Sequence, residues 1–206
     1  MWLKAEESYT MLNFIAEMQE QLILFISGGG SNARQIIHYF KENERVKVVG
    51  VLSSKPNLQM ETFCEEQKIS YLHIPGNDFG NYLQFCSELS ASWIILAGFL
   101  KKIPSALLSA FPDRIINIHP ALLPSYGGAG MYGQYVHRAV WAAEESFSGT
   151  TIHLVNEEFD KGKLLFRHAI ALKVISTAIE IEQQVRTLEL LHYAKDLDTF
   201  IKSTIR

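Results

Sequence analysis

The 206-residue chain contains very little cysteine. Its only two cysteines, Cys64 and Cys86, lie far apart and outside any metal-type spacing. Such usage excludes a disulfide scaffold and a cysteine-based zinc site, and it is typical of a protein in a reducing compartment. We expect both thiols to pack between helices and sheet, and we expect no bound metal.

Long hydrophobic runs are also missing. No stretch approaches the roughly 18 apolar residues that a membrane-spanning helix needs. Residues 1–20 carry four acidic side chains and lack the basic start and apolar run of a signal peptide. The sequence therefore predicts a cytoplasmic protein with no membrane partner.

Neither sign of charge dominates. Lys and Arg total 19 against 22 Asp and Glu, which gives a formal net charge of -3. This balance offers no electrostatic footprint for nucleic acid. An anionic ligand would have to be bound by a local feature of the chain.

The apolar residues form short, nearly continuous runs separated by helical patterns. Alternation of this kind predicts parallel βαβ units, that is, an α/β fold with one mostly parallel, twisted, Rossmann-like sheet and helices on both faces. The expected strands are residues 22–26, 46–52, 93–97, 115–118, 150–155 and 163–172. The expected helices are residues 33–40, 58–67, 79–89, 104–110 with Pro104 at the first helical position, 135–145 and 177–201.

The chain divides into an N-terminal extension, residues 1–20, and one domain, residues 21–206. The extension has apolar residues at mixed helical spacing, which favours an amphipathic helix. It could equally be a loosely attached segment, or Met18 could be the true start. A helix here could pack on its own domain or on a neighbour, so both a monomer and a homodimer are open.

A glycine-rich segment, Ser27-Gly28-Gly29-Gly30-Ser31-Asn32, joins the first predicted strand to the first predicted helix. Glycines permit a tight turn with positive φ, and we expect Ser31 or Asn32 to cap the helix. The N–H groups at such a helix terminus bind phosphate. The segment matches neither the dinucleotide fingerprint nor the Walker loop, and a plain turn remains the alternative.

Asn117 and His119 end a predicted buried strand and precede a loop rich in glycine and proline, residues 120–133. By the alternation of strand residues both side chains should project to the same side, at the sheet edge where ligands bind in α/β folds. An amide donor beside an imidazole could stabilise an oxyanion and move a proton, which are the needs of acyl transfer.

A third segment, residues 149–162, combines a predicted strand with an acidic loop. A carboxylate of this loop could reach His119, orient it and raise its pKa, and Asp160 is our candidate. Spacing alone does not choose among Glu157, Glu158 and Asp160. We expect His153 to be packed or exposed and not catalytic.

These segments together resemble the glycinamide ribonucleotide formyltransferases, from about residue 22 to residue 201. The resemblance rests on Gly30-Ser31-Asn32, on Leu96-Ala97-Gly98-Phe99, on Asn117-x-His119-Pro120-x-Leu122-Leu123-Pro124, and on Gly149-Thr150 followed by Asp160. It implies a single Rossmann-like formyltransferase domain that transfers the formyl group of 10-formyltetrahydrofolate, as cosubstrate, to glycinamide ribonucleotide.

The resemblance also implies roles for individual residues. Asn117 and protonated His119 would stabilise the oxyanion, His119 would transfer a proton, and Asp160 would hold His119. Residues that would contact the ribonucleotide are Gly29, Gly30, Ser31, Asn32 and Glu189. Residues that would contact the reduced folate are Leu100, Lys101, Lys102, Ile103, Asn117 and Val155.

The chain departs from the family pattern at several positions. Ser125 stands where a lysine is usual, Asp160 is followed by Lys161 instead of glycine, and Lys101 replaces an arginine near the folate tail. Rival members of this chemistry, the methionyl-tRNA formyltransferases and formyltetrahydrofolate hydrolases, normally carry a further domain. A non-enzymatic nucleotide-binding protein would have no chemical reason to keep Asn117, His119 and Asp160.

Overall fold

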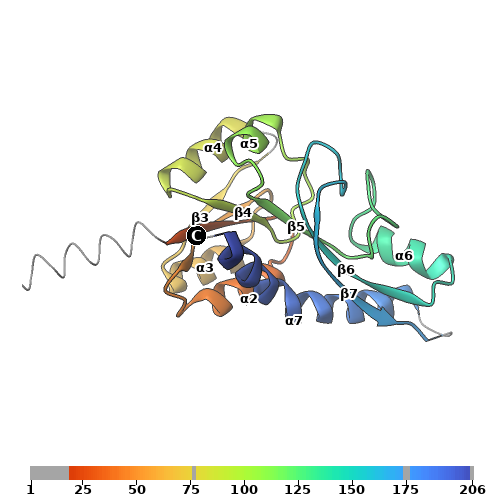
Figure 1. Ribbon diagram of the computed structural model, residues 1–206. Coiled ribbons are helices and arrows are strands. Elements are labelled where there is room, and N and C mark those ends of the chain that lie inside the picture. The colour runs from red at the N-terminus through yellow and green to blue at the C-terminus, as the bar shows by residue number, and fades with distance from the viewer. Residues whose placement is uncertain (1–18, 76–77, 174–176, 205–206) are drawn as a thin grey trace, which may run out of the picture.

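The structure is a computed structural model that describes residues 19–75, 78–173 and 177–204. The described residues form one seven-stranded sheet with the strand order β3-β2-β1-β4-β5-β6-β7 (Figure 1). The strands are β1 (Glu20–Ile26), β2 (Val46–Ser53), β3 (Ser70–His73), β4 (Trp93–Leu96), β5 (Ile115–His119), β6 (Phe147–Leu154) and β7 (Leu164–Ala171). The predicted α/β sheet is confirmed, and so are its six predicted strands.

One strand, β3, was not predicted. It is a four-residue edge strand whose side chains are half-buried or exposed. A half-buried edge strand needs no continuous apolar run, so its sequence gives no strong signal.

The sheet is parallel from β3 to β5 and antiparallel at β6 and β7. The antiparallel end departs from a simple repetition of βαβ units. After β6 the chain returns through residues 155–163 without a helix, and such a short connection can only join antiparallel neighbours.

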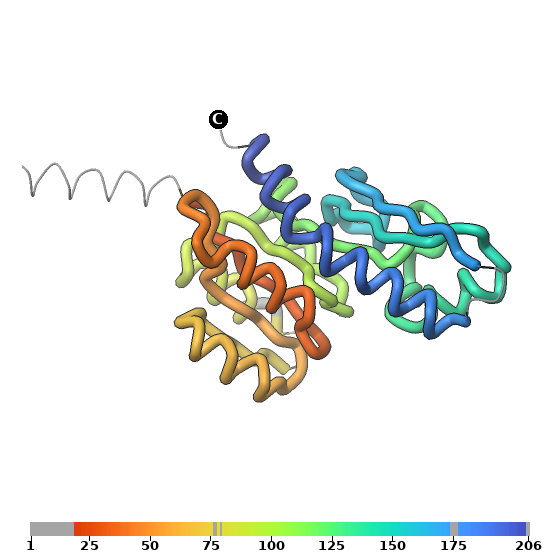
Figure 2. The backbone as a smooth tube through the Cα atoms, turned by 90° about the horizontal axis from the view of Figure 1, so that it is seen from below, coloured from red at the N-terminus to blue at the C-terminus, as the bar shows by residue number. Residues whose placement is uncertain are grey.

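Helices cover both faces of the sheet. Figure 2 shows α3, α2 and α7 side by side on one face, whereas α4 and α5 lie on the other (Figure 1). Their bounds are α2 (Ser31–Phe40), α3 (Leu58–Gln67), α4 (Phe79–Glu88), α5 (Ser105–Ala110), α6 (Gln134–Ala142) and α7 (Ala178–Thr204).

The central strand β1 explains the continuous apolar runs of the sequence. Leu22, Leu24 and Ile26 pack into the core beneath α2 and α7, while Ile23 and Phe25 pack into the core beneath α4 and α5. A strand buried on both faces has no side exposed to solvent, so apolar residues occupy successive positions instead of alternating with polar ones.

Helix ends differ from two of our expectations. The N-cap of α2 is Gly30, with φ 74°, and neither Ser31 nor Asn32 caps the helix with its side chain. Pro104 lies one residue before α5 as its N-cap and not at its first helical position. At α7, by contrast, a capping box is present: Thr177 N donates to Glu180 and Glu180 N donates to Thr177 Oγ1.

Cys64 in α3 and Cys86 in α4 are buried free thiols, as expected. Burial raises the pKa of Cys64 to about 11 and that of Cys86 to about 12, so both stay protonated and unreactive. Among the described helices, none combines the length and apolar character that crossing a membrane requires. The N-terminal extension falls outside the described residues except for Gln19 and Glu20.

Candidate functional site

A cleft of about 420 Å³ opens at the carboxyl ends of the central strands. The chain reverses its direction across the sheet between β1 and β4, and ligands of open α/β sheets bind at such a switch point. The volume lies in the range of small-molecule sites. All the site residues predicted from the sequence line it: Gly29, Gly30, Ser31, Asn32, Leu100, Lys101, Lys102, Ile103, Asn117, His119, Val155, Asp160 and Glu189.

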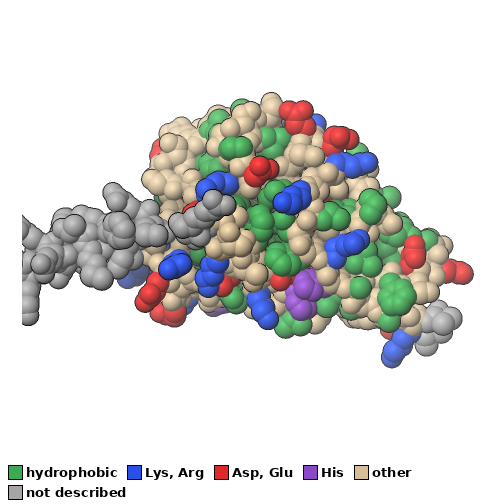
Figure 3. Space-filling view, in the orientation of Figure 1, with side chains coloured by type: hydrophobic (Ala, Val, Ile, Leu, Met, Phe, Trp, Pro, Cys, Tyr) green, Lys and Arg blue, Asp and Glu red, His purple; other side chains and the backbone are tan. Residues whose placement is uncertain are grey.

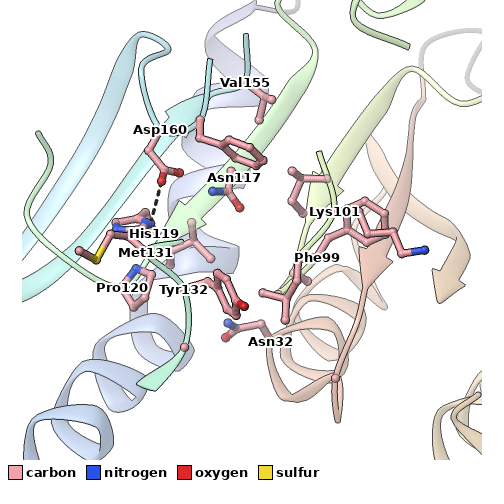
Figure 4. Close-up of a pocket in the computed structure, with 18 of the residues that line it drawn as sticks. Asn32, Phe99, Lys101, Asn117, His119, Pro120, Met131, Tyr132, Val155 and Asp160 are labelled. Carbon is pink, nitrogen blue, oxygen red and sulfur yellow. Dashed lines mark ion pairs between the residues drawn. The ribbon is translucent and has the colours of Figure 1, made fainter. Parts of the chain in front are cut away.

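Figure 4 shows how these residues divide the cleft. His119 and Asp160 face each other on one wall, with Asn117 beside them, while Asn32 and Lys101 lie away from this wall. The cleft therefore has a wall that carries titratable groups and, opposite to it, the glycine loop and the segment after β4.

The glycine loop presents backbone N–H groups to the cleft. Gly30 has φ 74°, and a Cβ there would also lie 2.1 Å from the Met60 side chain, so glycine is required at this position. Because no side chain caps α2, the N–H groups of its first turn remain available to a ligand. This geometry suits a phosphate or another anion.

Asn32 and Glu189 join this loop to the last helix. Asn32 Nδ2 donates to Glu189 Oε2 at 2.9 Å, which explains why the amide does not cap α2. The Oδ1 atom of Asn32 is buried and has no hydrogen-bond partner in the described part of the chain. Burial raises the pKa of Glu189, although Asn32 and Arg186 oppose the shift. The pair therefore offers an orphaned acceptor and a carboxyl group to a polar ligand.

The Asn117 amide is oriented by His153, its direct neighbour across β5 and β6. His153 Nδ1 lies 2.8 Å from the Leu154 carbonyl, which only accepts, so this nitrogen carries the proton in the neutral ring. His153 Nε2 then accepts from Asn117 Nδ2 at 3.1 Å. One N–H of Asn117 remains for the cleft.

His153 is thus a residue of the cleft that the sequence did not indicate. Its side chain is buried, which was one of the two expected placements. It also lines the cleft, and its Nε2 lies 3.5 Å from Asp160 Oδ1. The missing signal was strand register. Nothing in the sequence states that Asn117 and His153 are opposite each other.

His119 is held by a backbone carbonyl and faces a carboxylate. Its Nε2 donates to the Tyr126 carbonyl at 2.7 Å, and its Nδ1 lies 3.5 Å from Asp160 Oδ2. Because Nε2 carries the proton of the neutral ring, Nδ1 is the basic atom, and a proton taken up there would face Asp160.

Asp160 raises the pKa of His119, as expected, but the net pKa of this histidine is lowered. Burial lowers this pKa below its ordinary value, and although Asp160 and the Tyr126 carbonyl raise it, burial outweighs them. The free protein therefore holds a neutral His119 near pH 7. The contribution of Asp160 to the His119 pKa has the predicted sign, but burial makes a larger contribution of the opposite sign.

Asp160 is ionised despite its position in the cleft wall. Burial would raise its pKa, but contacts with His153 and His119 and the Gly128 N–H, which donates at 2.9 Å, bring the pKa below its ordinary value. The carboxylate thus joins the loop of residues 120–133 to the wall that carries His119. Asp160 itself has φ 57°, a position that Asp tolerates better than most residues.

A third histidine of the cleft, His137 of α6, was also not predicted. It is 4% exposed, and its Nδ1 has no hydrogen-bond partner among the described residues. Burial lowers its pKa, against the charge of Glu182. Within a helix its sequence pattern resembles that of any amphipathic segment, so only packing reveals it.

The predicted folate wall combines apolar and charged groups. Ile103 is buried, Val155 is half-buried, and Leu100 and Lys102 are exposed at the rim. Glu157 and Glu158 are exposed at the same rim. The observed wall can cover a flat apolar ring system while cations remain at its outer end.

Comparison with known proteins gives consistent matches. The formyl transferase family model matches residues 20–197. The chain is 36% identical to the chloroplastic phosphoribosylglycinamide formyltransferase of Arabidopsis thaliana over 81% of this chain and 60% of that protein. It is 33% identical to the protein of the same name from Vigna unguiculata over 97% of this chain and 67% of that protein.

The chain thus spans 60% and 67% of the lengths of these two plant relatives. Among solved structures, its fold is similar to that of glycinamide ribonucleotide transformylase 1 from Symbiobacterium toebii. The TM-score is 0.82 at 21% identity, with 90% of this chain and 89% of that chain covered. This last likeness establishes the architecture alone.

Proposed function

The chain belongs to the formyl transferase family, and on this premise we propose that it transfers the formyl group of 10-formyltetrahydrofolate to the amine of 5-phosphoribosylglycinamide, a step of purine synthesis. One observation carries the proposal. Asn117, His119 and Asp160 form one wall of a cleft whose other wall contains an uncapped helix N-terminus. The first wall suits acyl transfer and the second suits a phosphorylated acceptor.

The acceptor would bind with its phosphate at the first turn of α2. Gly29, Gly30, Ser31 and Asn32 supply N–H groups there, and Glu189 can accept hydrogen bonds from hydroxyl groups of the same ligand. The orphaned Oδ1 of Asn32 supports this placement, since a buried acceptor without a partner is costly until a ligand donates to it.

Asn117 and His119 would carry the chemistry. The free N–H of Asn117 would donate to the formyl oxygen, where negative charge develops as the amine attacks. His119, neutral in the free protein, would accept the proton that the amine loses, and Nδ1 is the atom able to take it. Asp160 would then stabilise the imidazolium through the 3.5 Å contact. Collapse of the tetrahedral intermediate would break the bond between the formyl carbon and N10 of the folate, and N10 would take up the proton as tetrahydrofolate leaves.

The reduced folate would lie along the segment from Leu100 to Ile103 and against Val155. Buried Ile103 and half-buried Val155 fit a flat pterin, and exposed Lys102 fits an anionic tail. A single ammonium group at Lys101, in place of a guanidinium, lacks the bidentate fork, so we propose modest selectivity for that tail. We propose no role for a metal in the transfer.

The test is an acceptor assay that follows the folate product spectrophotometrically. We expect turnover with 5-phosphoribosylglycinamide and none with water or methionyl-tRNA. Turnover with water would reassign the chain to hydrolysis of the formyl folate, and absence of turnover from a folded protein would overturn the proposal.

We also propose a cytoplasmic location, because both thiols are free and buried, as suits a reducing compartment. The names of the two plant relatives give a chloroplast location for those proteins. Fractionation of the source cells with immunodetection of the chain tests the proposal, and recovery in an organelle would contradict it.

A further inference from the structure

Three metal-ligating side chains converge where α7 crosses β7, outside the cleft. His168 belongs to β7, while His192 and Asp196 lie four residues apart on α7. One ligand atom from each can be chosen so that all three lie within 4.8 Å of one another. None of the three lines the cleft that holds His119.

The cluster is organised by two direct contacts. His168 Nε2 lies 2.5 Å from Asp196 Oδ2, and the rings of His168 and His192 stack at 3.8 Å with an interplanar angle of 12°. No hydrogen bond from the described residues reaches a ring nitrogen of His192. The contact between His168 and Asp196 joins strand and helix, whereas the ring nitrogens of His192 make no hydrogen bond within the described residues.

The donor set is that of a transition-metal site. Two imidazoles and one carboxylate suit Zn²⁺ and its neighbours, and the spacing of His192 and Asp196 places both on one helix face. Metal–ligand bonds of about 2.0–2.2 Å require ligand atoms roughly 3.4 Å apart in a tetrahedron, so small side-chain rotations would close the present cluster. Both backbone elements are already in place.

The site is accessible to an ion from solvent. The His168 side chain is 23% exposed, whereas that of Asp196 is 10% exposed. In Figure 3 histidine side chains lie open at the surface over the region that α7 occupies in Figure 1. The fourth coordination position would face water.

We propose that His168, His192 and Asp196 bind a divalent transition-metal ion, with Zn²⁺ as the reference ion, and that the ion clamps α7 onto β7. Three ligands and the nearby charge of Lys195 predict a dissociation constant on the order of micromolar, weaker than four-ligand structural zinc sites. Glu189 precedes His192 by one helical turn, so the clamp would also hold the helix that lines the cleft.

The test is zinc titration of the whole, untagged, chelator-treated protein by calorimetry, repeated with Co²⁺ to record its absorption bands. His192→Phe removes one nitrogen ligand and keeps an aromatic ring in the stack, while Asp196→Asn removes the charge and keeps the shape. His38→Ala is the matched control, since His38 is an exposed histidine of α2 outside the cluster.

Because His119 and His153 in the cleft could also take up zinc, the readout is the difference between the wild type and each variant. We expect both cluster variants to lose one equivalent of zinc, or to bind it at least about 30-fold more weakly, with His38→Ala unchanged. At a 100-fold excess over the dissociation constant, zinc should raise Tm by roughly 5–10 °C in the wild type and not in His192→Phe. Equal isotherms for the wild type and His192→Phe, or no zinc binding up to millimolar concentration, would overturn the proposal.

Discussion

Asn117 Nδ2 and His153 Nε2 lie 3.1 Å apart, across the antiparallel pairing of β5 and β6. The Leu154 carbonyl accepts from His153 Nδ1 and so fixes the tautomer of the neutral ring. This tautomer leaves Nε2 as an acceptor, which fixes the orientation of the Asn117 amide. An oxyanion donor is effective only if it is oriented before the charge forms. In the proposed mechanism His153 would therefore act as a positioning residue for Asn117.

A matched pair of substitutions tests this role. Gln at position 153 keeps an acceptor near the position of Nε2, whereas Asn is too short to reach Asn117. We expect His153→Gln to keep most of kcat and His153→Asn to lose about 10-fold or more, with little change in KM for the ribonucleotide. Steady-state kinetics measures kcat and KM for variants whose circular dichroism is that of the wild type. An equal loss of kcat in His153→Gln and His153→Asn would assign His153 a packing role only.

His119→Ala should reduce kcat by roughly 10²–10⁴-fold, because the group that accepts the amine proton is lost. The affinity of His119→Ala for the ribonucleotide should stay close to that of the wild type, since the proposed phosphate site lies on the opposite wall. Single-turnover kinetics and calorimetry measure the two quantities, and His38→Ala serves as the control. Near-normal turnover of His119→Ala would remove His119 from the mechanism.

The pH dependence of kcat tests the coupling between Asp160 and His119. The pKa of His119 is lowered by burial and partly restored by Asp160, and the base is active when neutral. Activity should therefore fall as pH decreases through this pKa, which lies below the ordinary value of a histidine. Asp160→Asn removes a raising contribution, so the acid limb should move to still lower pH while kcat decreases.

That profile is recorded with both substrates saturating, so that ionisation of the free acceptor amine does not contribute. A limb that stays in place in Asp160→Asn, or one that moves to higher pH, would show that the carboxylate does not act on the His119 pKa.

Gly162→Ala should destabilise the fold and distort the loop that carries Asp160. A Cβ at position 162 would lie 1.8 Å from the Leu154 carbonyl oxygen, which is backbone and cannot move aside easily. We expect a loss of at least about 2 kcal/mol in the free energy of unfolding. Gly80→Ala in α4 is the control, because only an Asp78 oxygen lies near its Cβ position, at 3.8 Å. Urea denaturation compares them, and equal stabilities would contradict the predicted clash.

Much of the architecture followed from the sequence, because burial leaves a local trace. The doubly buried runs of β1, β2 and β4 and the amphipathic patterns between them fixed the order of elements. Asn117, His119 and the glycine loop could be located because they stand at strand ends, and strand ends form ligand sites in this fold class. Asp160 was chosen over its acidic neighbours on family resemblance, since spacing alone left three candidates.

What the sequence alone determined was the set of elements other than β3 and the positions of groups at their ends. Tertiary structure alone decided how distant groups act on each other: strand register placed His153 on Asn117, burial turned the pKa of His119 downward against Asp160, and the α7–β7 packing assembled His168 with His192 and Asp196. The physical reason is the range of the interactions. Helix and strand patterns are short-range properties of the chain, whereas desolvation and side-chain convergence depend on segments that only folding brings together.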